Sequence, residues 1–226
     1  VLREMGIDFI TQENLGSAGG WNRGIDYALE NGFEAVWLMD DDGYPACNSL
    51  SILRKNLIEG VSCVSSVVVK EEDPGSFVFP YPILDANGHA ILFAYEIKIQ
   101  DLKSLKKLAL NSVYECAHLF NGALIPVAVI KKVGNVNSDF FMFGDEVDYF
   151  FRLKYFGKVI SITDALHYHP DVTRRAYTKE KIYYYIKNTL ILNEIYRDFY
   201  WVRFCMTLAA ILARVSKRNG LKMLLE

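Results

Sequence analysis

Three consecutive carboxylates, Asp40, Asp41 and Asp42, are the side chains of this sequence best suited to chemistry. They follow the continuous apolar run Ala35–Met39, which is typical of a strand buried on both faces of a parallel sheet. Carboxylates at the end of such a strand repel one another and are costly to desolvate, and a divalent cation relieves both penalties. Mg²⁺ and Mn²⁺ prefer oxygen ligands and commonly link carboxylates to phosphate oxygens. The pattern predicts a metal site at a sheet edge, with a solvated acidic turn as the alternative.

A glycine-rich segment, N-L-G-S-A-G-G, occupies residues 14–20. Its glycines allow the backbone to approach a ligand closely, and the N-terminus of a helix expected to start near Trp21 favours an anion. The spacing matches neither the G-x-G-x-x-G motif of dinucleotide folds nor a P-loop. The segment is therefore a candidate phosphate contact, with a flexible loop as the alternative.

Acidic residues also open a second expected helix, at Asp145, Glu146 and Asp148. The helix dipole favours acids at that position, so ordinary helix chemistry explains them equally well. The functional interpretation is that one carboxylate accepts the proton of an acceptor hydroxyl. His167 and His169 lie directly after a predicted strand, as metal or phosphate contacts or as packed residues.

Apolar patterning places these segments in an alternating α/β fold. Strands are expected at residues 7–10, 35–39, 61–69, 119–125 and 159–162. Helices are expected at residues 21–31, 49–59, 126–133 and 146–156 and from residue 178 onward, with a strand-rich insertion over residues 71–110.

Composition limits the classes of protein that fit. The chain has 226 residues, 51% of them hydrophobic and 14% aromatic, which supports a packed core and argues against disorder. A net charge of −2 gives no electrostatic reason to expect nucleic acid. The four cysteines form no C-x-x-C pair, so we expect reduced thiols in the cytoplasm. Neither a signal peptide nor an apolar stretch of ~20 residues is evident.

In this order, the motifs resemble those of glycosyltransferase family 2, whose members have the GT-A fold. The stretches N-L-G-S-A-G-G-W-N-R-G and W-L-M-D-D-D-G-Y-P are similar to the bacterial branch that includes galactofuranosyltransferases and rhamnosyltransferases. F-N-G-A-L-I-P, G-D-E-V-D-Y-F-F-R and Y-Y-Y-I-K-N fit the same branch. The resemblance covers residues 8–193 and implies a GT-A-like (Rossmann-like) α/β fold, a mixed sheet flanked by helices. We expect a catalytic domain over residues 1–175 and a C-terminal helical extension over 176–226.

The resemblance also implies a role for each matching residue. The metal, Mn²⁺ or Mg²⁺, would be held by Asp42, Asp40 and His169. Glu146 would be the catalytic base, with Asp145 as the alternative because the family's usual Glu-Asp pair is reversed here. His167 has no counterpart. The nucleotide-sugar would contact Gly19, Gly20, Asn22, Asp40, Asp41, Asn121 and Gly122. Nothing before Asn14 resembles the family's first nucleotide-binding strands, so we expect the chain to lack them.

The implied activity is inverting transfer of a hexose from a nucleoside diphosphate donor. The expected donor is UDP-galactofuranose or dTDP-rhamnose, and the acceptor is a glycan or lipid-linked glycan in cell-surface polysaccharide synthesis. Two alternatives remain, an inactive truncated domain and a metal-dependent nucleotidyltransferase. The second is disfavoured because no basic, glycine-rich triphosphate loop is evident.

The C-terminal segment has the composition of a helix that lies on a membrane surface. Residues 199–225 carry five basic side chains and no acidic ones. An apolar stripe in the same segment is formed by Phe204, Leu208, Ile211, Leu212 and Val215. The pattern predicts peripheral association with the cytoplasmic face of a membrane, or packing of the stripe on the domain or on a second subunit.

Overall fold

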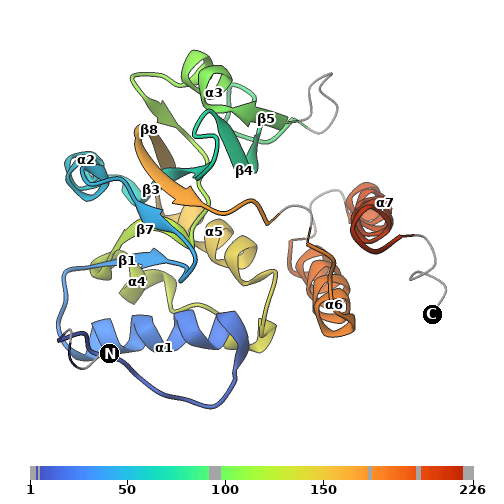
Figure 1. Ribbon diagram of the computed structural model, residues 1–226, viewed down its shortest axis with the longest axis horizontal. Coiled ribbons are helices and arrows are strands. Elements are labelled where there is room, and N and C mark those ends of the chain that lie inside the picture. Colours follow the sequence, from blue (N-terminus) through green and yellow to red (C-terminus); the bar gives the residue numbers. More distant parts are fainter. Residues whose placement is uncertain (1–3, 5, 92–97, 173–174, 197–199, 221–226) are drawn as a thin grey trace.

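A mixed sheet flanked by helices forms the centre of the computed structural model (Figure 1). The structure describes residues 4, 6–91, 98–172, 175–196 and 200–220. The sheet runs in the order β1 (Ala35–Met39), β7 (Asn121–Pro126), β3 (Val61–Lys70), β4 (Ser76–Pro82) and β5 (Lys98–Asp101). A further strand, β8 (Lys158–His169), pairs with β3 and also with two short strands, β2 (Tyr44–Pro45) and β6 (Val113–Tyr114).

Strand direction differs from the prediction at β1. The mixed sheet is confirmed, with β3 and β8 parallel, but β1 pairs antiparallel with β7. Within β1 only Leu38 is fully buried, so the strand expected to be covered on both faces is half-exposed. An apolar run reports burial and says nothing about the direction of the neighbouring strand, which is why this prediction was wrong.

Helices cover both faces of the sheet. On one face lie α1 (Gly16–Glu30), α4 (Val127–Val133) and α5 (Asp145–Phe156), whose apolar side chains form the largest core with those of the strands. On the other face, α2 (Ser49–Asn56) buries Leu53 against Val64 and Ile160. Two layers of helix around a sheet are the arrangement expected of an α/β domain.

The N-terminal part of the chain departs from the sequence prediction. Residues 7–10 form no strand, and α1 begins at Gly16 rather than near Trp21. Gly16 has a φ of +70°, and its N–H donates to the Asn14 side chain at 3.1 Å. The glycines taken for a loop therefore make up the first turn of α1, where tertiary contacts override their low helix propensity.

The strand-rich insertion is confirmed in part. Residues 71–110 contain β4 and β5, and they also contain a short helix, α3 (Leu102–Leu108). These elements enclose a separate apolar cluster that includes Phe77, Tyr81 and Leu105. Residues 92–97 of the predicted insertion lie outside the described residues.

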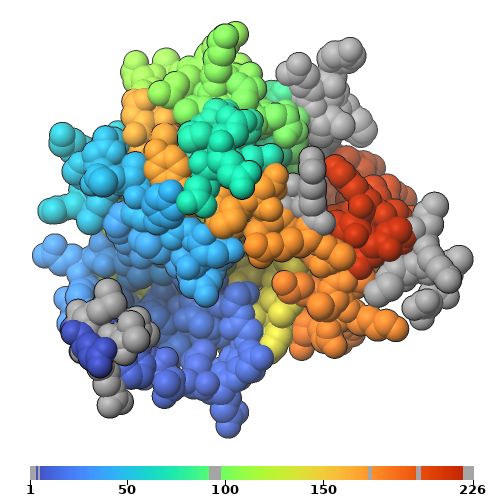
Figure 2. Space-filling view, viewed as in Figure 1, coloured from blue at the N-terminus to red at the C-terminus, as the bar shows by residue number. Residues whose placement is uncertain are grey.

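Two helices, α6 (Lys179–Ile195) and α7 (Tyr200–Asn219), form one side of the molecule, coloured orange and red in Figure 2. Ile211 and Val215 of the predicted stripe are buried against α6, whereas Leu208 and Leu212 are exposed. The predicted stripe is therefore divided between a packed and an exposed part of α7, and contact with a membrane stays a prediction. Phe199 and Lys222 of this segment lie outside the described residues. Among the described helices, none combines the length and hydrophobicity needed to cross a bilayer.

Candidate active site

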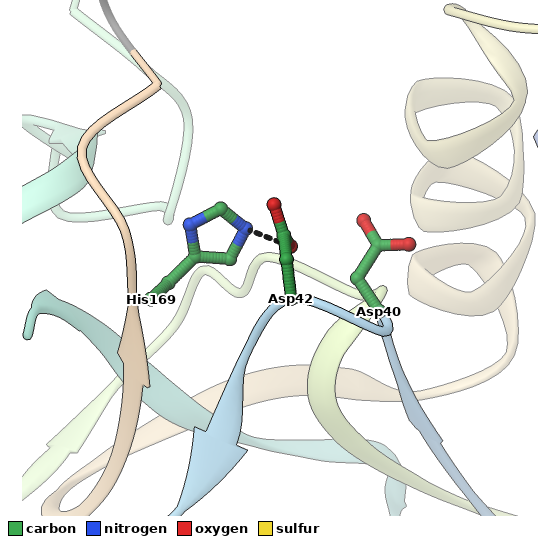
Figure 3. Close-up of side chains that lie close together, drawn as sticks. All are labelled: Asp40, Asp42 and His169. Carbon is green, nitrogen blue, oxygen red and sulfur yellow. Dashed lines mark ion pairs between the residues drawn. The ribbon is translucent and has the colours of Figure 1, made fainter.

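The predicted metal ligands converge in the structure. Asp40 and Asp42, which follow β1, and His169, at the end of β8, each offer a ligand atom within 4.8 Å of the others (Figure 3). His169 Nε2 lies 2.9 Å from Asp42 Oδ1. The set of two carboxylates and one imidazole fits a divalent cation, because these are oxygen and nitrogen ligands that such ions accept.

Pairing between the two-residue strand β2 and the end of β8 brings His169 to the aspartate turn, residues 40–43. Directly after the turn, Tyr44 pairs with Tyr168 and Pro45 pairs with His167 in an antiparallel ladder. A Cβ on Gly43 would overlap the ring of His167, so only glycine allows this approach. His169 is therefore held beside Asp42 by the backbone of both segments.

The hydrogen bonding of His169 suits a metal ligand. Its Nδ1 lies 2.7 Å from the carbonyl oxygen of Pro170, which can only accept, so Nδ1 carries the proton. Nε2 then faces a carboxylate oxygen of Asp42, and that contact requires either a second proton or a cation. An imidazole oriented by a carbonyl through its other nitrogen is the usual arrangement of metal-binding histidines.

Like charges gather around Asp40. Loss of solvation, together with the neighbouring charges of Asp42 and Asp41, raises the pKa of Asp40 to about 6, although the residue retains contact with solvent. Asp41 itself is exposed and does not join the cluster. A bound cation would relieve this repulsion, which is a second reason to regard the cluster as a metal site.

Asp145 and Glu146 lie near the same cluster, at the start of α5. Burial raises the pKa of Asp145 to about 6, with further contributions from Glu146 and from Asp40. Only 4% of Asp145 is exposed, and its Oδ2 has no hydrogen-bond partner among the described residues. Carboxylates whose pKa is raised by burial and by neighbouring charge, beside a candidate metal site, are typical of catalytic sites.

Glu146 has one oxygen fixed and one available. Its Oε1 accepts a hydrogen bond of 2.8 Å from the backbone N–H of Leu119 and lies 3.8 Å from His118 Nδ1. Burial raises the pKa of Glu146, and the Leu119 hydrogen bond opposes that rise. The side chain keeps an opening to solvent. The Leu119 hydrogen bond can therefore hold the Glu146 carboxylate in place while its Oε2 remains available to a substrate.

Asn121 and Gly122, at the start of β7, lie at an irregularity of the sheet. The register between β1 and β7 shifts between Leu38 and Met39, and Gly122 has a φ of +96°. Such bulges re-aim neighbouring side chains and are common beside active sites. Asn121 pairs with Met39, next to Asp40, and its buried Oδ1 has no partner among the residues that the structure describes.

The other predicted nucleotide-sugar contacts lie on α1. Gly19 is buried against Leu15, whereas Gly20 faces open space. Asn22 donates to the carbonyl oxygen of Val136 at 2.7 Å, so its amide nitrogen already has a partner in the protein. The structure thus gives Gly19 and Asn22 packing roles and leaves Gly20 accessible to a ligand.

Two further histidines lie near the site. His167, which the sequence offered as a metal or phosphate contact or as a packed residue, is fully buried. His118, for which the sequence suggested no role, is partly buried. Burial lowers the pKa of His118 to about 4, and burial together with His169 lowers that of His167 to about 4, so both rings are neutral at physiological pH. His118 packs against the ring of Tyr81 at 4.9 Å. No sequence motif signalled His118, because its neighbours come from distant segments.

Comparisons with known proteins find relatives that match part of the chain. No protein-family model matches the chain. Galactofuranosyltransferase GlfT1 of Mycolicibacterium smegmatis is 32% identical over 145 residues, which cover 63% of this chain and 46% of that protein. GlfT1 of Mycobacterium tuberculosis is 29% identical over 163 residues, which cover 71% and 50% respectively. The chain therefore spans about half the length of the curated relatives it matches.

The fold has a counterpart among solved structures. The crystal structure of GalNAc-T7 with UDP, GalNAc and Mn²⁺ matches 94% of this chain and 43% of its own, with a TM-score of 0.57 and 11% sequence identity. A likeness at that identity bears on the fold, which is the GT-A glycosyltransferase fold. The sequence likeness and the likeness in fold both relate this chain to glycosyltransferases.

Proposed function

We propose that this protein is an inverting glycosyltransferase that moves a sugar from a nucleoside diphosphate donor to a glycan. The observation that carries the proposal is the position of two carboxylates of raised pKa, Asp145 and Glu146, near the Asp40, Asp42 and His169 cluster. The Asp40, Asp42 and His169 cluster could hold the leaving diphosphate through a metal, while Glu146 or Asp145 receives the proton of the acceptor hydroxyl. We assign catalysis to residues 1–175 and regard residues 176–226 as a helical extension.

Asp40, Asp42 and His169 would hold Mn²⁺ or Mg²⁺. When bound, the ion would supply positive charge that offsets the charge developing on the leaving diphosphate. The imidazole of His169 supports Mn²⁺ over Mg²⁺, because Mg²⁺ prefers oxygen ligands alone. Gly20, Asn121 and the exposed Asp41 would contact the nucleotide-sugar around this centre, with Gly19, Asn22 and Gly122 shaping the backbone beneath it.

Glu146 would act as the base, with Asp145 as the alternative. The Leu119 N–H fixes Oε1 of Glu146, so the other oxygen is the one that would accept the proton of an acceptor hydroxyl. Its raised pKa strengthens it as a proton acceptor. A hydroxyl that attacks from the face opposite the diphosphate inverts the anomeric configuration.

The relatives' names support UDP-galactofuranose as the donor, and dTDP-rhamnose remains the second candidate. We propose a glycan or lipid-linked glycan of the cell surface as the acceptor and the cytoplasmic face of a membrane as the location. The exposed apolar side chains of α7, including Trp201, Leu208 and Leu212, support the proposed location at a membrane.

The test is a transfer assay with both donors, Mn²⁺ and a panel of glycan acceptors, using the purified protein. We expect transfer from UDP-galactofuranose, with loss of activity in excess chelator. NMR of the product should show an anomeric configuration opposite to that of the donor. Retained configuration would contradict the mechanism. Absence of transfer from every donor, together with normal Mn²⁺ binding, would favour an inactive domain.

A further inference from the structure

The backbone immediately before the two acidic residues of α5 is strained. Phe141 has φ +63° and ψ −61°, and the N–H of Met142 donates to the carbonyl oxygen of Phe140 at 2.7 Å. These values define a γ-turn of the rare form with positive φ, which is unfavourable for a residue with a Cβ. Phe143 and Gly144 also have positive φ, at +60° and +86°. Such a turn persists only when its surroundings hold it.

One side chain of α6 holds this turn. The amide nitrogen of Asn188 lies 2.6 Å from the carbonyl oxygen of Phe140 and 2.8 Å from those of Met142 and Phe143. Carbonyl oxygens only accept, so the nitrogen of Asn188 must be the atom that faces them. The side chain is fully buried, and its Oδ1 has no partner among the described residues. The donors are thus the part of Asn188 that the structure uses.

The turn links the site to other elements as well. The carbonyl oxygen of Phe141 accepts a hydrogen bond of 3.0 Å from the N–H of Ala18, in the first turn of α1. The ring of Phe141 stacks on Tyr184 of α6, with 4.7 Å between ring centroids. A Cβ on Gly144 would lie 3.1 Å from the Cβ of Asn188, so the helix start fits closely against this side chain.

We propose that Asn188 is a positioning residue, which holds the 140–143 turn in its strained form and thereby places Asp145 and Glu146 for catalysis. The proposal rests on the proposed function of those two carboxylates. Asn188 touches no substrate in this account. Without its donors, the three carbonyl groups lose these hydrogen bonds, although Phe140 keeps the one from Met142, and the turn relaxes to unstrained backbone angles. The carboxylates that follow the turn then move away from their working position.

The experiment compares Asn188→Ala and the nearly isosteric Asn188→Leu with Asn193→Ala as the matched control. Asn193 is also a buried asparagine of α6, 4% exposed, but among the described residues its amide nitrogen bonds Thr189 and Thr207 and not the turn. Three quantities are measured in each purified protein: kcat, the KM for the donor, and the rates of amide hydrogen exchange in residues 138–146. Asn188→Leu guards against loss of folding, because it nearly keeps the shape of the side chain and adds no buried charge, while it has no donor.

We expect both Asn188 variants to lower kcat roughly 10²-fold, the usual cost of a displacement of about 1 Å in a catalytic group. The donor KM should stay within about threefold of wild type, because the lost interaction acts in the transition state. Exchange at Met142 should accelerate in the Asn188 variants and stay unchanged in Asn193→Ala.

Wild-type kcat in the Asn188 variants would overturn the proposal, as would an equal loss of kcat in Asn193→Ala or unchanged exchange at Met142. If the wild-type protein transfers no sugar from any donor, the proposed function fails instead. In that case the exchange rates alone still decide whether Asn188 holds the turn.

Discussion

Asp145 offers a direct test of the electrostatics of the site, because replacing it with asparagine should stabilise the protein while reducing activity. The carboxylate is 4% exposed, and burial together with Glu146 and Asp40 raises its pKa from 3.8 to about 6. A buried acid that is ionised at neutral pH is a cost to folding. Proteins retain such costs mainly where function requires the charge.

The size of the effect follows from the shift in pKa. A rise from 3.8 to about 6 corresponds to about 3 kcal/mol of destabilisation when the carboxylate is ionised. In Asp145→Asn the amide oxygen can still accept from the helix start, but an amide nitrogen replaces the unpartnered Oδ2. Burying that nitrogen without an acceptor costs about 1–2 kcal/mol. We therefore expect a net stabilisation of about 1–2 kcal/mol above pH 7.

The stabilisation should depend on pH in a defined direction. The folded-state pKa of Asp145 lies above the unfolded value, so its favourable contribution is complete below about pH 4 and is lost as the pH rises through about 6. Asparagine does not titrate but keeps the cost of its buried nitrogen at every pH, so Asp145→Asn should be less stable than wild type by about 1–2 kcal/mol near pH 4 and reach its maximum advantage above pH 6. Urea denaturation across this range, with chelator present, measures the difference.

Asp148→Asn is the control for that experiment. Asp148 is also buried, but it pairs with Arg152 at 2.8 Å and accepts from the hydroxyl of Tyr196. Its replacement should destabilise the protein by about 1–3 kcal/mol, because it leaves the partly buried guanidinium of Arg152 without its partner charge. The electrostatic account of Asp145 is refuted if Asp145→Asn is less stable than wild type at pH 8, or if the difference between the two proteins does not change with pH.

Three further predictions address the ligand turn, the base and the surface of α7. Gly43→Ala should weaken Mn²⁺ binding about tenfold, because its Cβ would overlap His167 and displace the aspartate turn; unchanged binding in a Mn²⁺ titration would show that the turn adapts. Glu146→Gln should lower kcat about 10²-fold or more while preserving donor KM, and steady-state kinetics that show a normal Glu146→Gln beside a crippled Asp145→Asn would reassign the base. Leu212→Glu should reduce co-sedimentation with anionic vesicles, since Leu212 is 53% exposed; equal binding by both proteins would argue that α7 does not contact lipid.

The members of the ligand cluster could be picked out in the sequence, because each stands beside the end of a predicted strand. The resemblance then joined them into one set. Asp40 and Asp42 stand out as adjacent carboxylates after an apolar run, and His169 stands beside a strand end. The α/β class and the mixed sheet were also predictable from apolar patterning and from the resemblance. The structure adds that β2 pairs with β8, which explains why residues so distant in the chain meet.

Other features depend on tertiary contacts that no local pattern reports. The antiparallel partner of β1 comes from residues 121–126, more than 80 positions away, and an apolar run carries no information about it. The start of α1 was placed too late because glycine has low helix propensity, whereas Phe141 holds its first turn from a distant segment. Asn188 was visible in the sequence as part of Y-Y-Y-I-K-N, but its three carbonyl partners appear only in the fold.

We propose that Asp40, Asp42 and His169 form a divalent-cation site. The direct measurement is a titration with Mn²⁺, in which the electron paramagnetic resonance signal reports the free ion. It compares wild type, Asp42→Asn and Asp139→Asn. Asp139 is an exposed carboxylate that does not belong to the cluster, so its replacement controls for net charge. We predict that wild type and Asp139→Asn bind one ion per chain with equal affinity. Asp42→Asn should bind at least about tenfold more weakly. Equal Mn²⁺ affinity in all three proteins would contradict the claim.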